Sequence, residues 1–129
     1  SVAIERCYAE LPAVHCDPHQ IKQVFLNLLL NALQAVGDQG NVRIVTQARG
    51  GWAEVRVEDN GPGIPEDVID RVFDPFFTTR PTGEGLGLGL AQCYQTLLHH
   101  RGEISVSSKP GLGATFEVRL PAAPDREDD

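Results

Sequence analysis

The chain has 129 residues, a length typical of one domain, and its 41% hydrophobic and 22% charged residues are ordinary for a soluble globular protein. Its formal net charge of −7 argues against nucleic-acid binding, because contact with a phosphate backbone needs a positive surface. The three cysteines, Cys7, Cys16 and Cys93, form no C-x-x-C pair, so neither a zinc site nor a disulfide framework is indicated. We therefore expect a cytoplasmic location with reduced thiols.

Hydrophobic periodicity predicts helices and hairpins in one domain. The strongest helical signal begins at Asp17-Pro18, a cap residue followed by proline at the first helical position, and continues in apolar residues at i, i+3, i+4 and i+7. Two stretches with period-two alternation meet at Gly50-Gly51, which is typical of a hairpin. In the first half of the chain we expect two short extended segments within 1–16, a helix from 17 to about 37–40, and a hairpin of 41–48 and 52–58. In the second half we expect a short helix over 65–72, a mobile loop over 73–85, a helix from about 86 to 102, and a hairpin of 103–108 and 114–120.

These elements predict an α+β fold, a two-layer sandwich with a mixed sheet of about five strands and three helices on one face. Residues 1–121 form the expected domain. Residues 122–129 are acidic near their end and are expected to be a disordered tail.

Five amide side chains follow one side of the first long helix. At about 100° per residue they fall within an arc of about 80° that contains no charged residue; they are Gln20, Gln23, Asn27, Asn31 and Gln34. A solvated helix face usually carries Lys and Glu, which are better helix formers than Asn. The stripe is either an amide-rich polar face or the wall of a polar cavity, where amide oxygens would suit Mg²⁺.

A glycine-flanked aspartate follows the second strand of the first hairpin. Asp59-Asn60-Gly61-Pro62-Gly63 contains common turn dipeptides, so a simple β-turn is one interpretation. The other is that Asp59 directs its carboxylate into a pocket and accepts a hydrogen bond from an exocyclic amine, which adenine offers and guanine does not at the same position. Glycines there would let the backbone approach a flat ligand.

A glycine-rich segment runs into the last helix. Glycine at alternate positions from Gly83 to Gly89 favours neither helix nor strand, and free backbone amides at a helix N-terminus bind phosphate. The spacing does not fit G-x-G-x-x-G, and the chain has no Gly-Lys pair of a P-loop. A phosphate-binding loop and a flexible hinge remain as the two interpretations.

Taken in order, these motifs resemble the histidine-kinase ATPase family, which shares its fold with gyrase-type ATPases and the heat-shock-90 chaperones. The resemblance covers nearly the whole chain and implies a Bergerat-type ATP-binding fold. The short segment Thr78-Thr79-Arg80 resembles the nitrogen-regulation branch of sensor kinases. The matching boxes are Asn27-x-x-x-Asn31-Ala32, Asp59-x-Gly61-x-Gly63, Phe73-Asp74-Pro75-Phe76-Phe77, Gly85-Leu86-Gly87-Leu88-Gly89-Leu90 and Gly111-Leu112-Gly113-Ala114-Thr115.

The resemblance implies ATP and Mg²⁺ as cofactors. It implies that Asn31 ligates Mg²⁺ with Asn27 beside it at the metal and phosphates, that Asp59 binds the adenine amino group, and that Arg80 reaches the terminal phosphate. Asn27 and Arg80 are the implied catalytic residues. Gln34 stands where many histidine kinases carry a basic residue, which leaves Arg80 as the expected cation of the site. The further residues that the resemblance places at the nucleotide are Gly61, Gly63, Ile64, Phe73, Thr79, Gly85, Leu86, Gly87, Leu88, Gly89 and, at the adenine edge, Thr115.

The implied function is transfer of the γ-phosphoryl group of ATP to a histidine on a separate phosphoacceptor and dimerisation domain. The implied second partner is the receiver domain of a response regulator, and no direct membrane contact is expected. One alternative is an ATP-hydrolysing clamp, but such relatives carry Glu where Asn27 stands, and an amide cannot act as a general base. The other alternative is a module that binds nucleotide for regulation only.

Overall fold

The protein is described by a computed structural model, which covers residues 2–7, 14, 16–37, 40–74, 88–109 and 111–122. Among these residues no helix is both long and apolar enough to cross a membrane. Residues 75–85 of the loop expected over 73–85, and residues 123–129 of the tail expected over 122–129, lie outside the described residues. The elements, in chain order, are β1 (Val2–Cys7), α1 (Pro18–Val36), β2 (Gly40–Arg49), β3 (Trp52–Asp59), α2 (Glu66–Ile69), α3 (Leu88–His99), β4 (Glu103–Lys109) and β5 (Gly113–Pro121).

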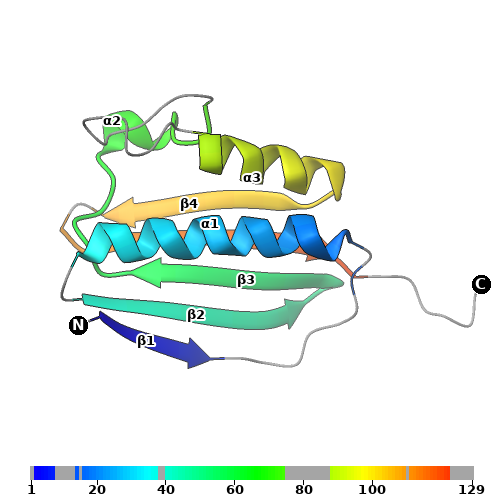
Figure 1. The fold of residues 1–129 in the computed structure, drawn as a ribbon, viewed down its shortest axis with the longest axis horizontal. Helices are drawn as coiled ribbons and strands as arrows, with labels where there is room; N and C mark the ends of the chain where they lie inside the picture. Colours follow the sequence, from blue (N-terminus) through cyan, green and yellow to red (C-terminus); the bar gives the residue numbers. More distant parts are fainter. Residues whose placement is uncertain are drawn as a thin grey trace, which may run out of the picture.

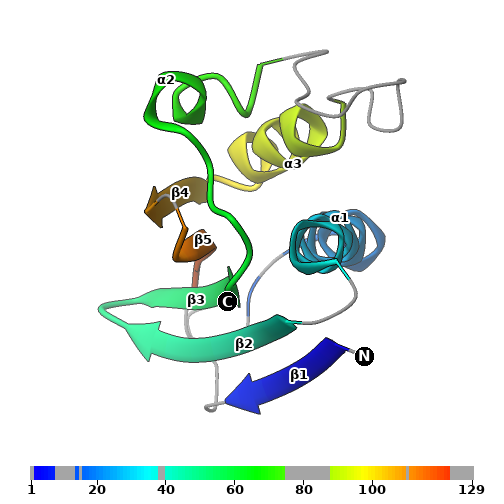
Figure 2. The same ribbon diagram turned by 90° about the vertical axis from the view of Figure 1, so that its left-hand side faces the viewer.

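The strands form one sheet in the order β1-β2-β3-β5-β4. β1 is parallel to β2, and the remaining neighbours are antiparallel. α1 and α3 lie side by side over one face of this sheet, and the short α2 lies beyond the edge formed by β4 (Figures 1 and 2). The predicted α+β two-layer class with a mixed sheet is confirmed.

Local sequence explains where α1 begins and ends. The Asp17 side chain accepts hydrogen bonds from the backbone amides of His19 and Gln20, at 3.0 and 3.2 Å, which satisfies two amides that have no partner inside the helix. Gly37 ends the helix at a φ of 67°, a conformation that favours glycine. The apolar stripe of α1 packs on the sheet and on α3; the buried cluster consists of Ile21, Val24, Leu28, Ala32, Val42, Val57, Cys93, Leu97, Phe116, Val118 and Leu120.

Two expected elements differ from the structure. Of the two extended segments expected within 1–16, the first is strand β1, whereas Val14 and Cys16, the described residues of the second, are not in a strand. The helix expected over 65–72 ends at Ile69 and continues as turns through Phe73. Phe73 packs against Tyr94 and Phe116. This tertiary packing outweighs the local helix propensity of the residues before Phe73.

Among the described residues, one buried charge lies on the uncovered face of the sheet. Glu54 is only 4% exposed, because side chains of neighbouring strands cover it. It accepts hydrogen bonds from Gln47 at 2.6 Å and from Arg119 at 3.0 Å, and Arg49 lies 3.6 Å away. The Arg119 guanidinium in turn lies 4.5 Å from the centre of the Trp52 ring. Polar side chains thus cross-link β2, β3 and β5 on the face opposite the helices.

Strand register aligns three residues on the helix-covered face. Asp59 is the partner of Ala114 on β5, and Ala114 is the partner of Ser108 on β4. Directly opposed residues point to the same side of a sheet, and Ala114 is buried in the covered face. The carboxylate at the end of β3 therefore lies in one row with Ala114 and Ser108.

Candidate functional site

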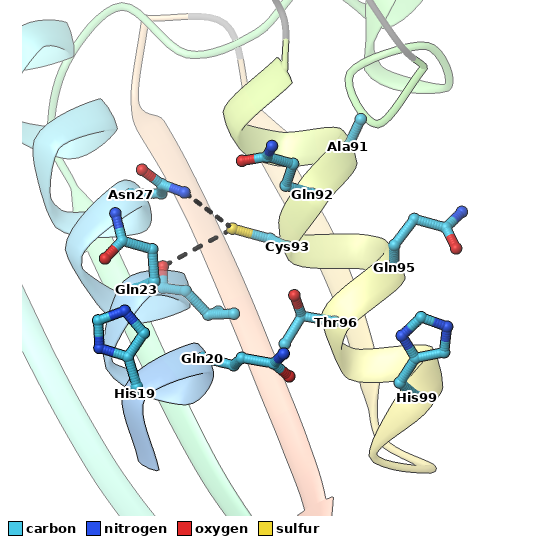
Figure 3. Close-up of a pocket in the computed structure, with 11 residues that line it drawn as sticks. His19, Gln20, Gln23, Asn27, Ala91, Gln92, Cys93, Gln95, Thr96 and His99 are labelled. Carbon is cyan, nitrogen blue, oxygen red and sulfur yellow. Dashed lines mark hydrogen bonds between the residues drawn. The ribbon is translucent and has the colours of Figure 1, made fainter. Parts of the chain in front are cut away.

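A groove of about 460 Å³ lies between α1 and α3, and most of the residues that line it are of polar types. Figure 3 shows amides of α1 facing Gln92, Cys93 and Thr96 of α3. Of the five amides predicted to line a cavity, three do so, namely Gln20, Gln23 and Asn27. The remaining residues of the lining are His19, Val24, Ala91, Gln95 and His99.

Asn27 is held at the upper end of this groove by contacts with α3. Its Nδ2 donates to the sulfur of Cys93 at 3.9 Å, and the thiol donates to the carbonyl of Val24 at 3.7 Å. Burial raises the pKa of the Cys93 thiol to about 11, so the thiol keeps the proton that it donates. A side chain at Gly89 would begin 3.7 Å from Cγ of Asn27. Asn27, the first asparagine of the Asn27-x-x-x-Asn31-Ala32 motif, therefore lies next to Gly89.

Asn31 lies one turn after Asn27 on the same side of α1 and is half-buried. No group of three or more His, Cys, Asp or Glu side chains that could hold a metal occurs in the described ranges. A divalent cation bound here would therefore depend on amide and ligand oxygens. In Figure 3 the oxygen of Asn27 points away from Cys93, an orientation that leaves a hard oxygen donor available, as Mg²⁺ prefers.

The carboxylate of Asp59 is oriented by two backbone amides. Its Oδ1 accepts hydrogen bonds from Gly61 at 2.9 Å and from Ala114 at 3.4 Å. Within the part of the chain that the structure describes, no donor reaches Oδ2. Burial raises the pKa of Asp59, and the two amides partly oppose that effect. This half-buried carboxylate is fixed on one side and can accept a hydrogen bond on the other.

The glycines around Asp59 allow close packing within the chain, and the expectation that Gly61 and Gly63 make room for a flat ligand stays a prediction. A Cβ on Gly61 would lie 2.7 Å from the carbonyl oxygen of Ala35, and one on Gly63 would lie 2.6 Å from that of Lys109. At Gly113, which has a φ of +107°, a Cβ would lie 1.9 Å from the carbonyl oxygen of Asp59. The glycines thus let α1, β3 and the β4–β5 turn meet at the carboxylate.

Thr115 does not lie at the expected position. It is the register partner of Glu58, and because side chains alternate along a strand it points to the uncovered face, away from Asp59. Ala114, one residue earlier, lies beside the carboxylate. The register therefore places Ala114, and not Thr115, beside the carboxylate that the motif predicts to bind adenine.

Phe73 and Ile64 belong to the margin of the hydrophobic core. The Phe73 ring stacks on Tyr94 with centroids 5.9 Å apart and meets Phe116 edge-on at 6.2 Å. Ile64 also packs against the core, and its backbone amide donates to the Ser108 hydroxyl at 2.7 Å. The structure therefore gives Phe73 a packing role and gives Ile64 a place next to the Asp59 loop.

Several expected site residues lie outside the described residues: Thr79, Arg80, Gly85, Leu86 and Gly87. For Leu88 the structure describes only the backbone, at the first position of α3. Sequence reasoning missed Cys93, Ser108 and Ala114. Period-two alternation could have placed Ser108 and Ala114 on the apolar face of their strands, but their alignment with Asp59 depends on long-range register.

Known proteins of one family match most of this chain. Residues 16–124 match the model of the histidine kinase-, DNA gyrase B- and HSP90-like ATPase family. The signal transduction histidine-protein kinase AtoS of Escherichia coli K12 is 45% identical over 116 residues, which are 89% of this chain and 19% of AtoS. The chain thus spans about a fifth of the length of that relative.

Two solved structures have the same fold. The mycobacterial sensor histidine kinase MprB superposes with a TM-score of 0.83 at 31% identity, over 96% of this chain and 84% of the MprB chain. Full-length ShkA in complex with AMPPNP superposes with a TM-score of 0.82 at 31% identity, over 97% of this chain and 27% of ShkA. The ordered motifs, the fold and these matches together show that the chain belongs to the histidine kinase-, DNA gyrase B- and HSP90-like ATPase family.

Proposed function

We propose that this chain is the catalytic ATP-binding module of a sensor histidine kinase and that it holds Mg-ATP for transfer of the γ-phosphoryl group to a histidine on another domain. The observation that carries the proposal is the setting of Asp59, with one oxygen fixed by the amides of Gly61 and Ala114 and the other facing no described donor. The sequence relative AtoS and the structural relative MprB are histidine kinases by name.

Adenine recognition follows from the chemistry of this carboxylate. An ionised carboxylate is an acceptor only, so Oδ2 of Asp59 can bind the exocyclic amine of adenine. Guanine has a carbonyl at the equivalent position, and two acceptors facing each other in a half-buried site are unfavourable. Asp59 therefore favours ATP over GTP.

The amides of α1 suit the opposite end of the nucleotide. Asn31, with Asn27 beside it, would hold Mg²⁺ through oxygen atoms without adding negative charge next to the phosphates. When bound, the metal supplies neutralisation of phosphate charge. The chain's own task is positioning, which the Asn27–Cys93 hydrogen bond performs by orienting one of these amides.

Arg80 completes the proposed site as the cation at the terminal phosphate, with Thr79 and the amides of Gly85, Gly87 and Gly89 beside it. A cation there would stabilise charge that develops as the phosphoryl group moves. The proposed partners are the phosphoacceptor and dimerisation domain that carries the histidine and a response-regulator receiver domain, all in the cytoplasm.

ATP hydrolysis by this chain alone is the less favoured alternative. Hydrolysis needs a base to activate water, and Asn27 occupies the position at which hydrolysing relatives place Glu. Its amide nitrogen is already engaged with Cys93. The arrangement fits a site that holds the nucleotide for an external nucleophile.

Labelled ATP distinguishes these functions. The chain is mixed with a purified histidine-hairpin domain, Mg²⁺ and γ-labelled ATP, and the Asp59→Asn variant serves as the matched control. Acid-labile label on the hairpin, absent from the control, supports the kinase. Release of phosphate with no label on the hairpin would identify a hydrolase, and nucleotide binding with neither would identify a regulatory module.

A further inference from the structure

The hydroxyl of Ser108 links two loops at the end of the sheet. It accepts a hydrogen bond from the backbone amide of Ile64 at 2.7 Å and donates one to the carbonyl of Gly113 at 3.0 Å. Ile64 belongs to the loop after β3, whereas Gly113 begins β5. A hydroxyl can serve both partners because it has a donor and acceptor sites.

These loops carry the two amides that orient Asp59. The amide of Gly61 comes from the loop after β3, and the amide of Ala114 comes from the residue after Gly113. Ser108 is also the third member of the row Asp59–Ala114–Ser108 across the covered face. Its hydroxyl thus lies where it can fix both donors without touching the carboxylate.

We propose that Ser108 is a positioning residue of the base pocket, which holds the two loops so that their amides orient the Asp59 carboxylate toward adenine. The inference rests on the proposed role of Asp59 in ATP binding. Ser108 acts through backbone groups and makes no contact with the nucleotide itself.

The close packing around Ser108 makes its hydroxyl important for the position of the loop after β3. A Cβ on Gly63 would lie 2.9 Å from the Ser108 oxygen, so the loop after β3 approaches this side chain closely. Without the hydroxyl, the amide of Ile64 loses its partner, and an unpaired polar group in a part-buried place is costly. The loop would then relax away from β4 and take Gly61 with it.

This linkage has a consequence for the charge of Asp59. Burial raises the pKa of Asp59, and the hydrogen bonds from Gly61 and Ala114 lower it. No charged side chain of the described residues contributes to this shift. Loosening the two amides would raise the pKa of Asp59 further, and the carboxylate would lose its charge at a higher pH.

The test compares four variants of the whole 129-residue chain by calorimetric titration with Mg-ATP and Mg-GTP. Ser108→Ala removes the hydroxyl, and Ser108→Cys keeps a weaker donor. Ser107→Ala is the matched control, because Ser107 is exposed on the same strand and pairs with Thr115 on the other face. Asp59→Asn serves as the benchmark for adenine recognition.

We expect Ser108→Ala to weaken ATP binding about three- to tenfold, the equivalent of one net hydrogen bond, and to weaken GTP binding less. The preference for ATP over GTP therefore falls, and Ser108→Cys gives a smaller change in the same direction. As the pH is lowered, Ser108→Ala should lose ATP affinity at a higher pH than the unmodified chain. Ser107→Ala should match the unmodified chain in both respects.

Two results would overturn the inference separately. If Asp59→Asn weakens ATP binding while Ser108→Ala keeps both the ATP preference and the pH dependence, Ser108 has no positioning role. If Asp59→Asn leaves ATP affinity unchanged, the proposed role of Asp59 fails, and the role of Ser108 fails with it. Should Ser108→Ala not fold, Ser108→Cys decides, because unchanged ATP preference and pH dependence in that variant would exclude the proposed role.

Discussion

The side-chain nitrogen of Asn27 donates to the sulfur of Cys93, 3.9 Å away, across the interface of α1 and α3. The thiol in turn donates a hydrogen bond to the carbonyl oxygen of Val24 on α1. Fixing the nitrogen of an amide also fixes the direction of its oxygen. The oxygen of Asn27 is thereby turned away from Cys93 (Figure 3). Helix α3 thus helps to orient the first asparagine of the Asn27-x-x-x-Asn31-Ala32 motif.

Replacing Asn31 by Asp should change metal dependence more than adenine recognition. The substitution keeps an oxygen ligand but adds a negative charge that repels phosphates when no metal is present. Calorimetry should show a large loss of ATP affinity without Mg²⁺ and a smaller loss with it. Gln20→Glu, which adds the same charge to an exposed position near the start of α1, is the control. Equal losses with and without Mg²⁺ would contradict the ligand assignment.

Replacing Asp59 by Asn should weaken ATP binding but not the fold. A donor would face the adenine amine, a mismatch that costs about 1–3 kcal/mol of binding free energy. The stabilisation by ATP in a thermal-shift assay should therefore shrink. A shift as large as that of the unmodified chain would exclude the adenine contact.

The same variant should be more stable than the unmodified chain when nucleotide is absent. Because burial raises the pKa of Asp59 in the folded state, the carboxyl favours folding at low pH, and this contribution is lost as the pH rises through the folded pKa. Asparagine carries no charge, so the higher stability of Asp59→Asn relative to the unmodified chain should be present at neutral pH and disappear in acid. Thermal unfolding at several pH values checks this. A stability difference between the two proteins that grows in acid would contradict the raised pKa of Asp59.

Gly113→Ala should destabilise the protein more than Gly111→Ala, although both residues have positive φ. Alanine at Gly111 would meet nothing within 4 Å, so its cost is left-handed strain, about 1–2 kcal/mol. Alanine at Gly113 would also meet the carbonyl oxygen of Asp59 at 1.9 Å, and the backbone must move to relieve the overlap. Denaturant unfolding of the two variants should show this order; equal losses would show that strain alone matters at this turn.

Glu54→Gln should lower the free energy of unfolding by about 1–3 kcal/mol at neutral pH, since charged hydrogen bonds are lost. The hydrogen bond from Gln47 and the charges of Arg49 and Arg119 lower the pKa of Glu54 from its ordinary 4.5, against the effect of burial. The stabilisation is therefore present above that value and lost as the pH falls through the folded pKa. Glu58→Gln, at a side chain that is 27% exposed, should cost less, and a difference that persists in strong acid would contradict this account.

Arg80→Ala should slow phosphoryl transfer more than it weakens ADP binding, because the cation is proposed to act on the γ-phosphoryl group. Hydrogen exchange should show stronger protection of residues 77–85 with an ATP analogue than with ADP. Equal protection in the free, ADP and analogue states would return the Gly85–Gly89 segment to the hinge interpretation.

The sequence by itself determined the elements and the order of the motifs. The cap at Asp17, the apolar spacing of α1 and the two-residue link at Gly50-Gly51 are local signals, and they predict local structure because their physical causes lie within a few residues. The fold class follows from these elements, since two hairpins and amphipathic helices can bury their apolar faces only in layers.

Only the tertiary structure decided which side chains meet. The β3–β5 register, formed between segments some 55 residues apart, places Ala114 rather than Thr115 beside Asp59, and a shift of one position reverses every side chain to the other face. Packing against Tyr94 and Phe116 likewise assigns Phe73 to the core margin. The contacts of Ser108 and Cys93 could likewise not be predicted from the sequence. A residue's partners across a sheet or between helices depend on the path of the whole chain.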